Sequence, residues 1–231
     1  MKVEFFGDFK LKDIILIASL PDMGRVGGLV STHIAKKTMA KAAAKVVLSD
    51  KPWVNQVDGL VEVPFDDYTI LVDEKNSLVI FTGETQPQEP NAVFELVDFV
   101  IDTVQKFGNV RLIISAGGYL PIQKTDGDQV YGVATDQKLL ESLKPHGVKT
   151  LSNDVKSITW FNGLVLGAAK NKNIHGIGLF GEIFDPEAPQ HRAAKNIINK
   201  IEKILKIQIN TDELQIAEKP HEPKKDGPGI G

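Results

Sequence analysis

The sequence contains no cysteine, which excludes disulfides, thiolate metal ligands and cysteine nucleophiles. Long apolar runs are also missing. The longest mostly apolar stretch, Ile14 to Leu20, spans seven residues, whereas a membrane-spanning helix needs roughly 20. The N-terminal segment carries charges every few residues and so lacks the pattern of a secretory signal peptide. We therefore expect a soluble protein of the cytoplasm.

Strong charge of one sign is absent as well. The net charge is −3 over 231 residues, and the lysines are scattered along the chain. Nothing in this pattern favours a nucleic acid or an anionic membrane as a partner. A hydrophobic content of 42% in a chain of this length is enough for the core of one large domain.

The apolar patterns alternate between buried strands and amphipathic helices. The run Ile14–Ala18 has no polar interruption, which is typical of a strand buried on both faces. Further strands are expected at 46–48, 78–81, 112–114, 130–133 and 174–180. Helices are expected from about Gly24, from Pro90, at 136–146 and 161–171, and through Ala194–Leu205. This order predicts a mostly parallel sheet with helices on both faces, and the pieces Leu60–Val63 and Tyr68–Val72 predict a meander or hairpin beside it.

The C-terminal segment has a different composition. Its last fourteen residues contain three prolines, three lysines and one large apolar residue, Ile230. Such a segment buries too little surface to offset the entropy of ordering. We expect one domain over residues 1–210 and a tail over 211–231, disordered from about 219.

Glycine-rich loops follow the expected strands, at the edge of a parallel sheet where ligands and partners bind. In the loop PDMGRVGG (21–28), Arg25 and the amides of a helix N-terminus suit an anion, but neither phosphate-binding glycine signature is present. The alternative is that these glycines allow a tight turn and close packing. The residues that could form a crevice or an interface here are Gly24, Arg25, Gly27, Glu84, Gln86, Ser115, Gly117, Gly118, Asn162, Gly163 and Glu182.

None of these residues forms a recognisable catalytic or metal-binding motif. Glu84 and Glu182 would suit general acid–base catalysis if they converged with shifted pKa values, but carboxylates beside turns also bind loop amides. Ser115 lacks the glycine frame of a nucleophile elbow. Asp185, Glu187 and His191 are close in sequence, yet a helix start after Pro186 explains them equally well. We therefore assign no catalytic, cofactor-binding or metal-binding residue and expect no cofactor.

Four segments in this order and spacing resemble the PAC2 family of proteasome-assembly-chaperone-like proteins: ASLPDMGRVGGLV (18–30), FTGETQPQEP (81–90), ISAGGYLP (114–121) and FNGLVLGAAKNKNIHGIGLFGE (161–182). The resemblance runs from about Ile14 to about Leu205. It implies a three-layer α/β/α fold similar to the phosphorylase/hydrolase-like folds, and a structural role for the glycine turn at 21–28. It also implies a homo-oligomer, a prediction to which the glycine-rich loops at 117–121 and 161–167 contribute.

The resemblance favours a non-enzymatic assembly chaperone or interaction protein that acts on proteasome α-subunits. Relatives that dock on the α-ring carry a C-terminal hydrophobic–tyrosine–any-residue tail, whereas this chain ends Gly229-Ile230-Gly231 and has no tyrosine after Tyr131. Ile230 is thus the candidate anchor of the tail. The alternative is an enzyme or a binder of a small, nucleotide-like ligand in the strand-end crevice.

Overall fold

A computed structural model gives the fold and describes residues 1–49, 51–121 and 126–214. The strands are β1 (Lys2–Phe5), β2 (Leu11–Ala18), β3 (Lys41–Leu48), β4 (Asn55–Val57), β5 (Leu60–Glu62), β6 (Asp66–Asp73), β7 (Leu78–Gly83), β8 (Gly108–Tyr119), β9 (Val130–Ala134), β10 (Lys149–Thr150) and β11 (His175–Glu182). The helices are α1 (Val26–Lys37), α2 (Pro90–Gln105), α3 (Gln137–Leu143), α4 (Trp160–Asn171) and α5 (His191–Leu205).

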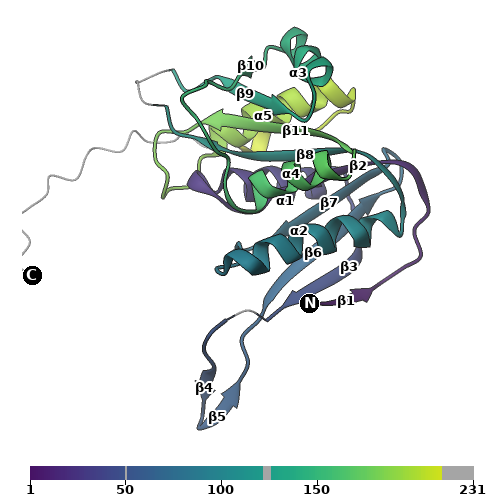
Figure 1. Ribbon diagram of the computed structural model, residues 1–231, viewed down its shortest axis with the longest axis vertical. Coiled ribbons are helices and arrows are strands. Elements are labelled where there is room, and N and C mark those ends of the chain that lie inside the picture. Colours follow the sequence, from purple (N-terminus) through teal and green to yellow (C-terminus); the bar gives the residue numbers. More distant parts are fainter. Residues whose placement is uncertain (50, 122–125, 215–231) are drawn as a thin grey trace, which may run out of the picture.

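A nine-stranded sheet of order β1-β3-β6-β7-β2-β8-β11-β9-β10 forms the body of the molecule (Figure 1). Its central strands β7, β2, β8 and β11 are parallel. On the β7 side, β6, β3 and β1 continue the sheet in antiparallel pairs. On the other side β9 pairs antiparallel with β11 and parallel with β10. The expected α/β class is confirmed, and the parallel part of the sheet is its centre.

Alternation along β2 explains the two helical layers. Ile14 and Leu16 face a core that contains α2 and α4, whereas Ile15 and Ile17 face a second core that contains α1 and α5. All four of these β2 side chains are buried. Because both faces of the strand are covered, its sequence must be apolar at every position. The three-layer arrangement expected from the sequence is thus present.

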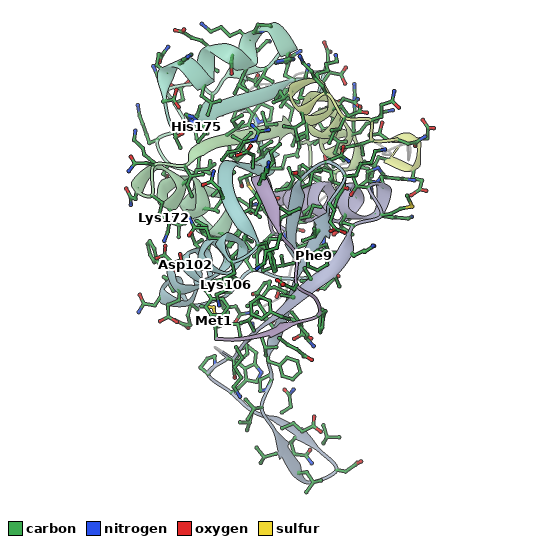
Figure 2. The ribbon with its side chains drawn as sticks, turned by 90° about the vertical axis from the view of Figure 1, so that its right-hand side faces the viewer. Met1, Phe9, Asp102, Lys106, Lys172 and His175 are labelled. Carbon is green, nitrogen blue, oxygen red and sulfur yellow. The ribbon has the colours of Figure 1, made fainter. Side chains whose placement is uncertain are left out.

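The segment between β3 and β7 agrees in part with the expected meander or hairpin beside the sheet, since Leu60–Glu62 is β5 of a hairpin. Tyr68–Val72 belongs to β6, which lies within the main sheet between β3 and β7. Among the described residues, only β4 and β5 form a separate two-stranded hairpin, which projects from one end of the body (Figures 1 and 2). Its turn is Asp58-Gly59, with both residues at positive φ, as a two-residue hairpin turn requires.

Two residues near the C-terminus, both within the predicted tail 211–231, contact the body of the domain. Leu214 is buried in the core that α1 and α5 share, and Glu213 pairs with Lys36 and Lys37 of α1. The remainder of the predicted tail, residues 215–231 with Ile230, lies outside the described residues. In the part of the chain that is described, no helix is both long and apolar enough to cross a bilayer.

Candidate functional site

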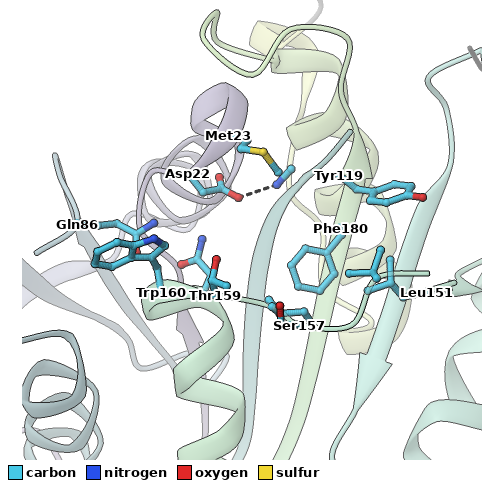
Figure 3. Close-up of a pocket in the computed structure, with 13 residues that line it drawn as sticks. Asp22, Met23, Gln86, Tyr119, Leu151, Ser157, Thr159, Trp160 and Phe180 are labelled. Atoms are coloured by element: carbon cyan, nitrogen blue, oxygen red, sulfur yellow. Dashed lines mark hydrogen bonds between the residues drawn. The ribbon is translucent and has the colours of Figure 1, made fainter. Parts of the chain in front are cut away.

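The candidate site lies where the central parallel strands end. The loop after β2, the loop after β7, the end of β8 and the N-terminus of α4 meet there (Figure 3). This is the sheet edge that the sequence predicted for the glycine-rich loops.

Asp22 is the central charged group of this edge, and sequence reasoning did not single it out. Its Oδ1 accepts the N–H of Gly27 at 2.9 Å, and its Oδ2 accepts the N–H of Gly118 at 2.7 Å. The Gly27 amide, which belongs to the helix N-terminus that the sequence suggested for a bound anion, therefore binds a carboxylate of the chain itself. The signal that could have identified it is an aspartate placed just before a helix.

Asn162, the third residue of α4, joins the end of β2 to the helix. Its Oδ1 accepts the N–H of Leu20 at 2.8 Å, and its Nδ2 donates to the carbonyl of Leu20 at 3.0 Å. The backbone carbonyl of Asn162 accepts the hydroxyl of Ser115 at 2.9 Å. All three residues are buried, so the Ser115 hydroxyl is an internal hydrogen-bond donor.

Gln86 makes a second link between the same elements. Its Nε2 donates to the carbonyl of Pro21 at 2.8 Å, and its Oε1 accepts the N–H of Phe161 at 3.0 Å. The loop after β7 thereby holds the loop after β2 against the first turn of α4. Two non-glycine residues beside these contacts have left-handed backbones, Arg25 at φ 54° and Trp160 at φ 57°. Such conformations persist where surrounding contacts fix them and are frequent at functional sites.

A cavity of about 360 Å³ opens beside this network (Figure 3). Its wall is mainly apolar and aromatic, with the polar groups of Asp22, Gln86 and Asn162 along one part. The lining residues are Asp22, Met23, Gln86, Gly118, Tyr119, Leu151, Val155, Ser157, Ile158, Thr159, Trp160, Asn162 and Phe180. An apolar cavity with a few converging polar groups has the form of a small-ligand pocket.

The two glutamates considered as a catalytic pair lie apart from this cavity. Glu84 is exposed, and its carboxylate is 3.8 Å from the Arg25 guanidinium. Glu182 is buried and accepts the hydroxyl of Tyr131 at 2.9 Å and the N–H of Gln129 at 3.3 Å. Burial, followed by the hydrogen bond to Glu182, raises the pKa of the Tyr131 hydroxyl to about 12. The structure thus brings Gln86, Ser115 and Asn162 together, but not Glu84 and Glu182.

The predicted glycines of this edge pack against other groups of the chain. An added Cβ on Gly117 would meet the Asp22 carboxylate at 2.6 Å, and one on Gly118 would meet the Met23 carbonyl at 2.4 Å. Gly163 is similarly close to the Ile158 carbonyl. Gly24, at φ 64°, donates its N–H to Pro186 at 2.7 Å. These contacts explain why glycine occupies each position.

Burial sets the protonation of Asp22. It raises the pKa of this carboxyl from 3.8 to about 6, although the N–H groups of Gly27 and Gly118 oppose the shift. Because the folded-state pKa lies above the unfolded one, protonation favours the native state. The stabilising contribution is complete below about pH 4 and is lost as pH rises to about 6.

Comparing Asp22→Asn with the wild type tests this pH dependence. The excess stability of the wild type over the variant is expected to fall by about 1–3 kcal/mol between pH 4 and pH 7. The variant also leaves one backbone N–H without an acceptor, a cost that does not depend on pH. Urea unfolding at several pH values measures the difference, and ¹³C NMR titration of the carboxyl measures the pKa. A carboxyl that titrates near pH 4 would contradict the expectation.

Asp185, Glu187 and His191 do not gather as a metal site. Asp185 accepts the N–H of Glu187 at 2.8 Å, which organises the turn before α5. Over the described ranges, no group of three histidine, aspartate or glutamate side chains is arranged to hold a metal ion.

Residues 16–221 match the sequence model of the PAC2 family, and the chain belongs to this family. A protein of Methanocaldococcus jannaschii is 28% identical over 211 residues, which cover 89% of this chain and 79% of that protein. The structure is similar to that of Pyrococcus furiosus PbaB, described as an archaeal proteasome activator. The TM-score is 0.77, with 27% identity and coverage of 92% of each chain.

Pyrococcus furiosus PbaA, described as an archaeal homolog of proteasome-assembly chaperone, has the same fold. It gives a TM-score of 0.74 at 22% identity, covering 92% of this chain and 85% of that one. The chain thus has the fold of these PAC2-like structures, and its sequence belongs to the same family.

Proposed function

We propose that this protein is a non-enzymatic assembly chaperone that acts on proteasome α-subunits in the cytoplasm. Two observations support the proposal. The similarity to PbaB extends over 92% of both chains, and the polar side chains at the strand ends hold the loops of the chain to one another.

The hydrogen bonds among the strand-end side chains support the proposal that the protein is not an enzyme. Ser115 donates to the Asn162 carbonyl, Asn162 holds Leu20, and both Asp22 oxygens accept backbone N–H groups. A general base or a nucleophile must instead lie within hydrogen-bond reach of a reacting group. The strand-end network is therefore better suited to fixing the shape of a binding surface than to proton transfer.

Affinity capture with recombinant proteasome α-subunits tests this function. We expect the full-length chain to retain α-subunits, and a chain truncated after Ile216 to retain fewer if the tail contributes. This truncation keeps Leu214, which is buried, so the melting temperature should stay nearly unchanged. Ile230→Ala should reproduce most of the loss. Failure of the full-length chain to retain any α-subunit would contradict the proposal.

A second candidate function is binding of a small, nucleotide-like ligand. The cavity of about 360 Å³ favours it, because Trp160 and Phe180 line it with aromatic rings on which a base can stack. A rise in melting temperature with an added nucleotide, abolished by Trp160→Ala, would favour this candidate over the first.

A further inference from the structure

The cavity at the strand ends has one charged residue in its lining, Asp22. Besides burial, the groups that act on the pKa of this carboxyl are backbone N–H groups and the side chain of Asn162, none of which is charged. The cation nearest to it along the chain, Arg25, has its guanidinium 3.8 Å from the carboxylate of Glu84 instead. A charge removed from water is normally paired. Among the described residues, however, Asp22 has no partner of opposite charge.

The other polar groups beside Asp22 are already engaged. The side-chain amides of Gln86 and Asn162 bind backbone groups through both their oxygen and their nitrogen. The N–H groups of Gly27 and Gly118 donate to Asp22. An anion that entered the cavity would therefore meet a carboxylate whose two amide donors are already used. The charge in the cavity favours a cation over an anion.

Aromatic rings line the same cavity. Tyr119 ends β8, Trp160 begins α4 and Phe180 belongs to β11. Phe180 is 6% exposed and Trp160 is 44% exposed, so one ring lies inside the molecule and the other reaches the surface. In the view of Figure 3, Asp22 lies above and between these two rings. The face of an aromatic ring attracts a cation because its π-electrons give it negative charge.

We propose that the cavity binds a small organic cation, a methylated ammonium group carried on an apolar body. The Asp22 carboxylate neutralises the charge of the ligand, and the aromatic rings stabilise it further. The apolar body packs against the apolar part of the lining, which includes Leu151 and Ile158. A volume of about 360 Å³ is near the lower end of the range for ligand pockets, roughly 300–1,000 Å³, and suits a small ligand.

The engaged side-chain amides explain why a methylated ammonium fits better than a primary one. A primary ammonium has three N–H donors that need acceptors. The amide oxygens of Gln86 and Asn162 already accept backbone N–H groups, so few acceptors are left for these donors. A fully methylated ammonium has no N–H donor and loses none of these bonds. This proposal does not depend on the action on proteasome α-subunits.

Binding of benzyltrimethylammonium to the full chain is the first test, measured by isothermal titration calorimetry at pH 7. We expect a dissociation constant of about 1 mM or lower. Its uncharged analogue, in which carbon replaces the ammonium nitrogen, has the same shape and should bind at least roughly tenfold more weakly. Equal affinity for the two compounds, or no saturable binding of the cation, would overturn the proposal.

A nucleotide is the competing ligand, because the same cavity is the site of the second candidate function. Adenosine monophosphate carries a phosphate and should bind more weakly than benzyltrimethylammonium, since Asp22 repels an anion. Tighter binding of the nucleotide would refute the cation site and favour that candidate.

Two variants separate the charge from the aromatic ring. Asp22→Asn should weaken binding of the cation roughly tenfold or more and leave the affinity for the uncharged analogue within about twofold. Phe180→Leu keeps an apolar side chain but removes an aromatic face, and should weaken binding of the cation roughly threefold or more. Phe94→Leu is the matched control, because Phe94 is 56% exposed and does not line the cavity.

Circular dichroism establishes that each variant is folded, and Phe180→Leu remains a test if Asp22→Asn does not fold. A folded Asp22→Asn or Phe180→Leu protein with wild-type affinity for the cation would contradict the proposed site. Loss of affinity in Phe94→Leu as well would show that the probe binds elsewhere and would contradict it too.

The pH dependence of binding gives an independent measurement. The charge of benzyltrimethylammonium does not change with pH, so a change in affinity reports on the protein. Burial raises the pKa of the Asp22 carboxyl to about 6. Affinity should therefore fall roughly tenfold between pH 7 and pH 5, as Asp22 becomes protonated. Asp22→Asn should remove this dependence, and a wild type with constant affinity over this range would count against the proposal.

Other titratable groups surround the cavity, and the Asp22→Asn comparison corrects for them. Tyr119 is the other titratable residue in the lining. The charged residues on the neighbouring segments lie outside the lining: Arg25, Glu84, Asp154, Lys156, Glu182 and Asp185.

Capture of proteasome α-subunits is scored separately on the same variants. A protein that captures α-subunits without binding the cation would overturn the cation site alone. A protein that binds the cation and captures no α-subunit would overturn the proposed function alone.

Discussion

Replacing Asn162 with alanine is expected to lower the free energy of unfolding by about 2–6 kcal/mol. The reason is that the Asn162 side chain satisfies both the N–H and the carbonyl of Leu20, at 2.8 and 3.0 Å, in a fully buried position. Alanine leaves both backbone groups without a partner, and each buried unsatisfied group costs about 1–3 kcal/mol.

Chemical denaturation measures the effect of Asn162→Ala, with Asn171→Ala as the control. Asn171 is the last residue of the same helix and is exposed. Its replacement should change stability by no more than about 0.5 kcal/mol. If the two variants were equally stable, the side chain of Asn162 would not hold the end of β2 as described.

Substituting Gly27 is the other change with a large expected effect. A Cβ added there would lie 2.4 Å from the Leu20 carbonyl oxygen and 2.8 Å from that of Ala116. Both contacts are with backbone at the ends of central strands, which cannot move aside as a flexible side chain would. We expect Gly27→Ala to destabilise the protein by at least about 2–3 kcal/mol.

Gly167→Ala is the matched comparison for Gly27→Ala. Gly167 is also helical, and an added Cβ meets nothing within 4 Å. The substitution should stabilise the protein by about 0.5–1 kcal/mol, because alanine loses less conformational entropy in a helix. Thermal and urea unfolding of both variants should therefore shift in opposite directions. Stabilisation by both substitutions would show that helix propensity outweighs the close approach of α1 to the sheet.

The central strands were predictable from sequence because each is buried on both faces. The uninterrupted run Ile14–Ala18 is typical of such a strand, and it lies within β2. β1 was missed because Lys2–Phe5 is a mostly exposed edge strand of four residues, so its alternation of polar and apolar residues is too short to be distinct. Tyr68–Val72 was expected in a meander or hairpin beside the sheet because its sequence does not specify its partners, β3 and β7.

The sequence predicted where in the fold the residues of the candidate site lie, but not which of them are joined by hydrogen bonds. Chain order places Gln86, Ser115 and Asn162 near the ends of parallel strands, and they are joined there. The same order places Glu84 and Glu182 at this edge, yet side-chain direction separates them. Asp22 was overlooked because its role depends on the amide of Gly118, 96 residues away. Contacts between distant segments are set by tertiary packing, which local patterns do not encode.

Because the Leu20 backbone is hydrogen-bonded to the Asn162 side chain, the end of β2 cannot complete its native contacts until most of the chain has been synthesised. The two residues are 142 positions apart, and ribosomes add roughly 5–20 residues per second. The end of β2 therefore emerges many seconds before the side chain that completes it. During that interval the polar backbone of Leu20 has only water as a partner, and β2 lacks its neighbour β8 until residue 119 has emerged. The nascent protein thus passes through a stage in which β2, whose run Ile14–Ala18 is buried in the folded protein, is unpaired along one edge, and such an edge is prone to aggregation.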